Sequence, residues 1–254
     1  MFGYSPGEPV FERISLTIYP GEKICILGAN GSGKSTLLKL ICGLVFPWAG
    51  QFTAFGDEIS EKYFENDVLA KEYHRRVGFV FQNSDAQLFS TRVWDEIAFG
   101  PLQMGWGSEA VKQRVEDVLK MLNLCHLRDR SPYRLSGGEK KKVAVAAVLA
   151  LNPEVLVLDE PTNGLDPKTQ RWLTELLLEL NNHGRTIITA THNLELAHAI
   201  SDRVLVLSEQ HELVYDGPSL AALENKELLM SVNLIDEYCH NHGDGAHIHL
   251  HTHD

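Results

Sequence analysis

The run Lys23-Ile24-Cys25-Ile26-Leu27, followed at once by Gly28-Ala29-Asn30-Gly31-Ser32-Gly33-Lys34-Ser35, decides the fold. Its first five residues have the apolar composition of a buried strand. The next eight match GxxxxGK[ST] in full, and the residues from Lys34 to about Gly43 indicate a helix. A strand, a glycine loop and a helix in this order form the setting in which the motif binds phosphate groups. An alternative, a glycine turn before an exposed lysine, explains the motif but not this order of elements.

Each residue type in the loop has a chemical task. Glycines let backbone N–H groups curl around β-phosphate oxygens, and the helix N-terminus favours an anion. Lys34 neutralises charge between the β- and γ-phosphates, and the Ser35 hydroxyl binds Mg²⁺. The predicted nucleotide contacts are Asn30, Gly31, Ser32, Gly33, Lys34, Ser35 and Thr36.

A second acidic site follows the apolar run Val155 to Leu158, which ends in Asp159 and Glu160. Acids at the carboxyl end of a parallel strand lie where such sheets bind ligands. Asp159 can hold Mg²⁺, and Glu160 can orient and deprotonate an attacking water. Alone this pair is weak evidence; together with the glycine loop it predicts a magnesium-dependent nucleotide site.

The rest of the chain predicts an α/β fold with a parallel sheet covered on both faces, because short apolar runs alternate with helix-length segments. Helical periodicity dominates about residues 83–150, which predicts a helical subdomain inserted into the sheet domain. Further strands are expected at Val77 to Phe81, Thr186 to Thr189 and Val204 to Leu207, the last forming a hairpin with Glu212 to Tyr215.

Composition excludes several classes of function. There are 23 Lys and Arg residues against 34 Asp and Glu, a net charge of −11, which argues against a nucleic-acid partner. The four cysteines show no CxxC pair, as is usual in a reducing compartment. The sequence has no signal peptide and no apolar run long enough to span a bilayer, so any membrane role would be that of a peripheral subunit.

Leu135-Ser136-Gly137-Gly138-Glu139 precedes a helix and closely resembles the signature sequence of ABC ATPases. Other marks of that family occur in its order: Gln82 after a strand, Gly164-Leu165-Asp166 after Glu160, and His192 after the strand that begins at Thr186. The resemblance covers about Tyr4 to Pro218.

The resemblance implies a P-loop NTPase (RecA-like) parallel sheet core with an inserted ABC helical subdomain. The expected ATPase domain is 1–224, and 225–254 is a C-terminal extension. Family members use Gln82 to contact Mg²⁺ or water, His192 to contact the γ-phosphate and hold Glu160, and Tyr4 to stack on adenine. Ser136, Gly137 and Gly138 would bind the nucleotide held by a partner chain, with Asp166 at the interface.

Two such chains must then meet head to tail, as a homodimer or a pair of related ATPases, on integral-membrane transporter subunits at the cytoplasmic face of the cell membrane. One departure from the family concerns the start: the β-strand that usually precedes the adenine-stacking aromatic is not evident before Tyr4. We expect that this edge strand is missing or that the chain is shortened, and a missing strand would loosen the adenine site at Tyr4.

The segment from Phe81 to Gly100 resembles ATPases of energy-coupling-factor importers, particularly the cobalt and nickel branch. Its cues are Gln87, Phe89, Asp95 and Ala98-Phe99-Gly100; Ser84 departs from a common proline. A vitamin importer, or an exporter, stays open. A soluble ABC ATPase in DNA repair or translation is a further alternative, which the absence of coiled-coil insertions and of a second ATPase unit disfavours.

A flexible histidine-rich tail occupies 240–253. Imidazole suits Ni²⁺, Co²⁺ and Zn²⁺, and alternating histidines can surround one ion. An affinity tag and a solvated tail with adventitious metal affinity are the alternatives to metal storage or regulation. The candidate ligands are His240, His242, His247, His249, His251 and His253.

Overall fold

The computed structural model describes residues 1–5 and 7–236. The predicted metal-binding tail at 240–253 lies outside the described residues. The strands are β1 (Lys23–Leu27), β2 (Thr53–Ala54), β3 (Asp57–Glu58), β4 (Val77–Val80), β5 (Val155–Asp159), β6 (Thr186–Thr191), β7 (Arg203–Leu207) and β8 (Leu213–Pro218). The helices are α1 (Lys34–Ile41), α2 (Glu61–Phe64), α3 (Asp67–Arg76), α4 (Ser84–Gln87), α5 (Val93–Gln103), α6 (Ser108–Met121), α7 (Gly137–Leu149), α8 (Pro167–Asn182), α9 (Leu194–Ile200), α10 (Ser219–Glu224) and α11 (Lys226–Ser231), with 3₁₀ turns η1 (Cys125–Leu127) and η2 (Pro132–Arg134).

The main sheet has the strand order β4-β5-β6-β1-β7-β8. Neighbouring strands from β4 to β7 are parallel, and β8 pairs antiparallel with β7. The predicted parallel α/β core is therefore confirmed, as is the hairpin that closes it. The short β2–β3 ribbon forms a separate sheet.

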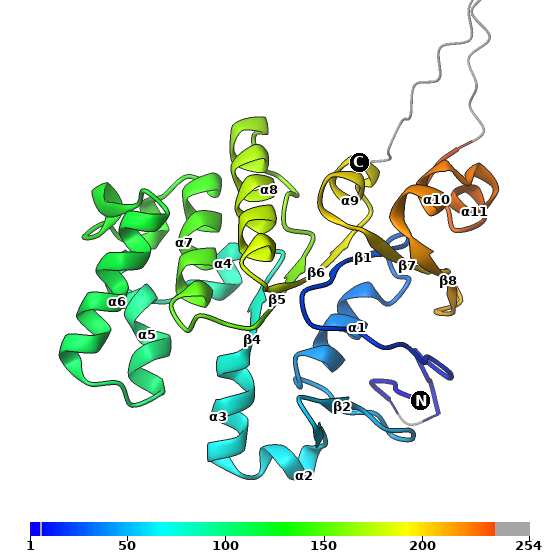
Figure 1. Cartoon of the computed structure of the whole chain (residues 1–254), viewed down its shortest axis with the longest axis horizontal. Coiled ribbons are helices and arrows are strands. Elements are labelled where there is room, and N and C mark those ends of the chain that lie inside the picture. Colours follow the sequence, from blue (N-terminus) through cyan, green and yellow to red (C-terminus); the bar gives the residue numbers. More distant parts are fainter. Residues whose placement is uncertain (6, 237–254) are drawn as a thin grey trace, which may run out of the picture.

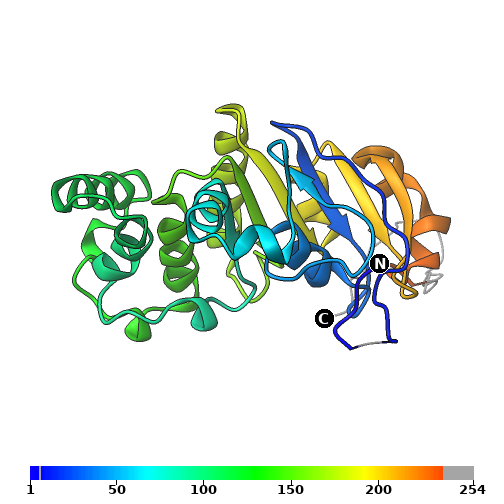
Figure 2. The same ribbon diagram turned by 90° about the horizontal axis from the view of Figure 1, so that it is seen from below.

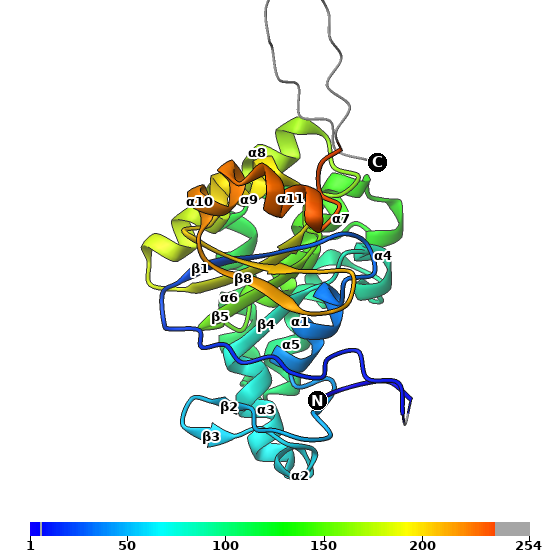
Figure 3. The ribbon, with the colours of Figure 1, turned by 90° about the vertical axis from the view of Figure 1, so that its right-hand side faces the viewer.

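Helices cover both faces of the sheet (Figures 1 and 3), as its apolar strands require. Within β1, Ile24 and Ile26 pack into the cluster on the α1 face. Cys25 and Leu27 point the other way and pack with residues of α9, α10 and α11. Successive side chains of a strand face opposite sides, so one five-residue strand supplies both layers of the core.

The helical insertion between β4 and β5 extends to one side of the sheet (Figure 2). Its apolar side chains belong to the same buried cluster as the sheet: Leu119 of α6 and Val145 of α7 share it with Leu156 and Leu158 of β5. The insertion and the sheet are therefore joined through one continuous core.

At the N-terminus, Phe2 pairs with Phe11 through an isolated antiparallel bridge, and no longer strand precedes Tyr4 among the described residues. At the other end, Leu229 and Leu234 pack into the α9-side cluster, so the chain stays on the sheet beyond residue 224. The proposed boundaries, 1–224 and 225–254, stay a prediction. Among the described residues, no helix has the length and apolar character needed to cross a membrane.

Candidate functional site

The glycine loop joins the end of β1 to the start of α1. Gly31 and Gly33 have φ values of 86° and 98°, which side chains with a Cβ rarely adopt. A Cβ on Gly33 would also lie 2.8 Å from the ring of Phe11. Gly33 caps α1 with no side-chain hydrogen bond, so the first N–H groups of the helix stay available to an anion.

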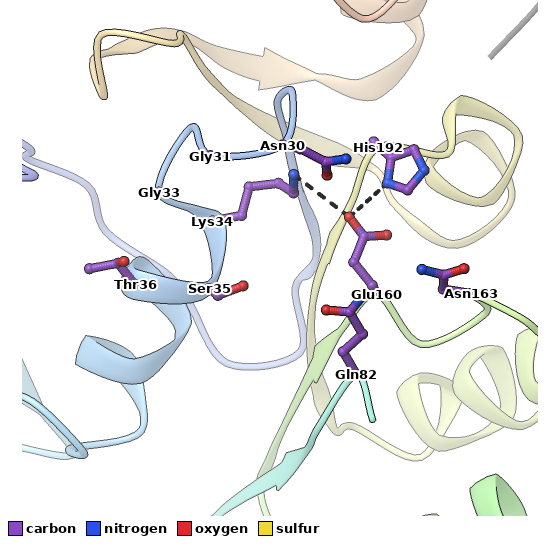
Figure 4. Close-up of a pocket in the computed structure, with 10 residues that line it drawn as sticks. All are labelled: Asn30, Gly31, Gly33, Lys34, Ser35, Thr36, Gln82, Glu160, Asn163 and His192. Atoms are coloured by element: carbon purple, nitrogen blue, oxygen red, sulfur yellow. Dashed lines mark hydrogen bonds and ion pairs between the residues drawn. The ribbon is translucent and has the colours of Figure 1, made fainter. Parts of the chain in front are cut away.

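Ten residues line one pocket at this loop, called here the phosphate-loop pocket (Figure 4). Nine of them are predicted site residues from four segments of the chain, and the tenth is Asn163. They are Asn30, Gly31, Gly33, Lys34, Ser35, Thr36, Gln82, Glu160, Asn163 and His192. The parallel sheet brings them together because the strands β1, β4, β5 and β6 all end at the same edge.

Lys34 reaches across this pocket. Its Nζ donates to the carbonyl oxygens of Gly28 at 2.7 Å and Ala29 at 3.1 Å, and lies 3.6 Å from Glu160 Oε1. Burial lowers the pKa of Lys34, while the charges of Glu160 and Asp159 oppose that shift. An ammonium group that faces the phosphate-loop pocket and lies 3.6 Å from its nearest carboxylate is placed to bind phosphate oxygens.

Glu160 is held at three points. Its backbone N–H donates to the carbonyl of Ala190 at 2.8 Å, Thr191 Oγ1 donates to Oε2 at 2.9 Å, and His192 Nδ1 lies 2.9 Å from Oε1. When Glu160 is ionised, its carboxylate only accepts hydrogen bonds, and His192 then donates to it through Nδ1–H. Glu160 also has a φ of 38°, a strained conformation for a residue with a side chain. A carboxylate fixed in this way can act on a water at a defined position.

Asp159, the last residue of β5, lies beside Ser35 and is 7% exposed. Burial raises the pKa of this carboxyl, and a hydrogen bond to Ser35 opposes the rise. Asp159 Oδ1 is buried with no hydrogen-bond partner. An unsatisfied carboxylate oxygen next to a hydroxyl fits a Mg²⁺ ion, which binds through one or two protein oxygens, waters and substrate phosphates. No group of three or more His, Cys, Asp or Glu residues that could hold a metal occurs in the described part of the chain.

Two predicted nucleotide contacts, Ser32 and Tyr4, are not among the residues that line the phosphate-loop pocket. Ser32 is fully buried, and its hydroxyl has no partner. Tyr4 is 57% exposed, and its hydroxyl lies 3.2 Å from Thr36 Oγ1. The ammonium group of Lys39 stands 5.6 Å from the Tyr4 ring centroid. Tyr4 therefore lies beside α1 even without a preceding edge strand.

Ser136, Gly137 and Gly138 do not line the phosphate-loop pocket. Ser136 caps α7 and forms a capping box with Glu139, and both Ser136 and Gly137 are exposed. A Cβ on Gly138 would lie 2.8 Å from Thr169 Oγ1, so this end of α7 packs against the start of α8, which Asp166 caps. The chain thus presents two separate candidate surfaces for a nucleotide.

Sequence reasoning missed two residues. Asn163 lines the phosphate-loop pocket, and its position three residues after Glu160 was the available signal. Lys141 was not singled out from the sequence, yet it is 2% exposed. Its Nζ donates to the carbonyls of Phe81 and Gln82, both at 2.9 Å, and burial lowers its pKa to about 8. No local pattern distinguishes this buried lysine from its neighbours.

A glycine loop between a parallel strand and a helix, with buried acids on the adjacent strand, defines a P-loop nucleotide-binding protein. Comparison with known proteins gives the family. Residues 11–163 match the family described as ABC transporter. An ABC transporter ATP-binding protein of Methanosarcina acetivorans is 55% identical, over 95% of this chain and 89% of that protein. The chain therefore belongs to the ABC transporter family as an ATP-binding, ATP-hydrolysing subunit.

Two further relatives have more specific names. The nickel import ATP-binding protein NikO of Rhodobacter capsulatus is 46% identical over 92% of each chain. The energy-coupling factor transporter ATP-binding protein EcfA2 of Methanospirillum hungatei is 41% identical over 92% of this chain and 57% of that protein.

Solved structures give the same family. CbiO1 from Clostridium perfringens, part of the ABC transporter complex CbiONQ, has a TM-score of 0.78 and 35% identity, and the likeness covers 92% of this chain and 91% of that one. A dimeric ATP-binding cassette in a post-hydrolysis state with ADP and Pi bound has a TM-score of 0.75 and 29% identity, covering 85% and 94%.

Proposed function

We propose that this chain is the ATP-hydrolysing subunit that powers a membrane importer of nickel or cobalt ions. The observation that carries the ATPase part is the Glu160 carboxylate, held by Thr191 and His192 opposite Lys34 in the phosphate-loop pocket. The cargo is supported by the likeness to a nickel import protein and to CbiO1, and by the resemblance of residues 81–100 to the cobalt and nickel branch.

The residues of the pocket divide the chemistry between them. Backbone N–H groups of the glycine loop and Lys34 hold the β- and γ-phosphates. Ser35, Asp159 and Gln82 would hold Mg²⁺, which neutralises charge on the phosphates. Glu160 takes a proton from the attacking water, and His192, fixed through Nδ1, keeps Glu160 in place.

The contact between Lys34 and Glu160 must lengthen or break when ATP binds. The single positive charge of the ammonium group cannot fully neutralise both the carboxylate and the phosphates. The γ-phosphate then lies between the lysine and the base. Release of the Glu160 carboxylate from Lys34 leaves it free to accept a proton from the attacking water only when nucleotide is bound.

Two chains act together in this proposal. The exposed Ser136 and Gly137, at the N-terminus of α7, would complete the phosphate-loop pocket of a second chain, and each chain would offer the same to its partner. Hydrolysis would reopen the pair, and membrane subunits at the cytoplasmic face would respond to the opening and closing. The dimeric cassette with ADP and Pi supports this arrangement.

Hydrolysis is tested by phosphate release from MgATP by the full chain. Glu160→Gln keeps the shape of the side chain but cannot act as a base, so kcat should fall by about 10² or more. Glu175→Gln, an exposed change on α8, is the matched control and should hydrolyse at the unaltered rate. A Glu160→Gln variant as fast as the unaltered chain would contradict the assignment of the base.

The cargo is tested in cells, with membrane subunits present. Cells in which the only gene for this chain carries Glu160→Gln should lose uptake of radiolabelled Ni²⁺ or Co²⁺. In a separate experiment, the unaltered chain should co-purify with membrane subunits. Uptake of both ions at the unaltered rate would rule out the proposed cargo.

A further inference from the structure

Lys141 is a buried lysine in the second turn of α7, the helix that begins at the signature residues. Its side chain crosses to the loop after β4, where Nζ donates to two successive backbone carbonyls, those of Phe81 and Gln82, each at 2.9 Å. Gln82 itself lines the phosphate-loop pocket. One side chain therefore joins the start of α7 to the residue that faces the nucleotide.

Stability alone does not account for a lysine here. The side chain is 2% exposed and forms no ion pair within 4.0 Å among the described residues; the charge of Asp159 acts on it only from a longer distance. Burying an ammonium group costs several kcal/mol, and two neutral carbonyls offset only part of that cost. An apolar side chain of similar volume would fill the space at lower cost, as Val143 and Ala144 do further along α7.

The Phe81–Gln82 backbone is also fixed from its other side. Gln87 Oε1 accepts a hydrogen bond from the Phe81 N–H at 3.0 Å. Lys140 makes a second link from α7, to Asp85 at 2.6 Å, but the Asp85 side chain is 63% exposed. An exposed ion pair of this kind contributes little, so the buried Lys141 contacts carry the link.

We infer that Lys141 is a positioning residue, which holds the Gln82 main chain on α7 so that Gln82 faces the phosphate-loop pocket. The inference rests on the proposed function, in which Gln82 serves the chain's own nucleotide and the start of α7 serves the partner's. A shift of α7 on meeting the partner's nucleotide then moves Gln82 as well. Lys141 thereby couples the two nucleotide sites of the dimer.

A double-mutant cycle on the full chain tests this inference, with single-turnover ATP hydrolysis as the readout. Lys141→Met should lower the rate about tenfold, since a small misplacement of a positioning group costs that much or more. In a Gln82→Ala background the same change should cost less than twofold, because the group that Lys141 positions is already gone. Equal fold losses in both backgrounds, or no loss in either, would overturn the inference.

The matched control is Lys140→Met, which removes the neighbouring lysine and its exposed pair and should leave the rate within twofold. Hydrogen exchange adds a readout independent of catalysis: amides in 81–88 should exchange faster in Lys141→Met, and amides in 28–35 should not. Unchanged exchange in 81–88 would also overturn the inference. If Lys141→Met folds poorly, Lys141→Arg enters the same cycle, since its larger head group displaces the loop while keeping donors.

The outcomes separate the inference from the proposed function. An unaltered chain that releases no phosphate from MgATP would contradict the proposed function. An active chain with additive losses in the cycle would contradict the role of Lys141 alone.

Discussion

Glu160 combines a strained backbone conformation and a buried carboxylate with a side-chain position that is fixed by hydrogen bonds. Its left-handed backbone is strained, and its carboxylate is almost fully buried beside Lys34. The backbone N–H of Glu160 donates to the carbonyl of Ala190, and its carboxylate is hydrogen-bonded to Thr191 Oγ1 and His192 Nδ1. Such an over-determined carboxylate is typical of a residue that acts on a substrate.

His192 should matter for the rate of hydrolysis more than for ATP binding. His192→Ala removes the Nδ1 hydrogen bond to Glu160 but leaves the glycine loop intact, so kcat should fall about 10–100-fold while KM for ATP changes less than about threefold. Steady-state phosphate release over a range of ATP concentrations gives both constants. His183→Ala, at the exposed histidine that caps the C-terminus of α8, is the control. A rise in KM with an unchanged kcat would contradict the role given to His192.

Nine of the ten residues that line the phosphate-loop pocket were singled out from the sequence, because they fall in ordered motifs at strand ends. The sequence did not predict Lys141, since burial of one lysine within Lys140-Lys141-Lys142 depends on where α7 meets the loop after β4. Asn163 was missed for a similar reason: the turn after Glu160 directs it into the phosphate-loop pocket.

Among the elements, α7 joins the two candidate nucleotide surfaces. Its N-terminal residues are exposed, its second turn holds the Gln82 loop, and its later turns are buried in the core. The exposed end is the part that a partner chain can reach.

Gly137→Ala tests that end of α7. A Cβ at Gly137 meets nothing within 4 Å in the single chain, so the melting temperature should change by no more than about 2 °C. The methyl group would project toward a nucleotide on the partner, and hydrolysis should therefore fall about tenfold or more. Gly107→Ala is the matched control, because that glycine also begins a helix with open space around it. A Gly137→Ala chain of normal activity would count against a shared site.

The strands of the parallel core were predicted because each is a continuous apolar run. The spatial order β4-β5-β6-β1-β7 was not predicted. Strands that are distant in the sequence become neighbours in the sheet, and the paths of the connecting helices decide which strands pair. Helix α3 was also missed. Its sequence, Asp67 to Arg76, is polar, and it is anchored mainly by Tyr73, whose hydroxyl donates to the carbonyl of Ile41.

At the scale of the whole molecule, the helical insertion shares one core with the sheet. Leu119 is fully buried in the same cluster as Leu156, and three tryptophans, Trp94, Trp106 and Trp172, pack against it. The insertion should therefore unfold together with the sheet.

Leu119→Ala should destabilise the chain by about 2–5 kcal/mol and lower one common unfolding transition. Urea unfolding followed by both tryptophan fluorescence and circular dichroism measures this. Leu102→Ala, at a position 52% exposed, is the control and should have little effect. Two separate transitions, of which Leu119→Ala shifts only one, would show that the insertion unfolds on its own.

In the proposed dimer, two chains enclose ATP between the phosphate-loop pocket of one and the Ser136–Gly138 segment of the other. Sedimentation of the Glu160→Gln chain with and without MgATP tests it most directly, because a chain that binds but does not hydrolyse ATP should stay closed. We expect a single-chain mass without nucleotide, a two-chain mass with MgATP, and loss of that dimer when Ser136→Arg is added. A single-chain mass in saturating MgATP, or a dimer that forms regardless of Ser136→Arg, would contradict this arrangement.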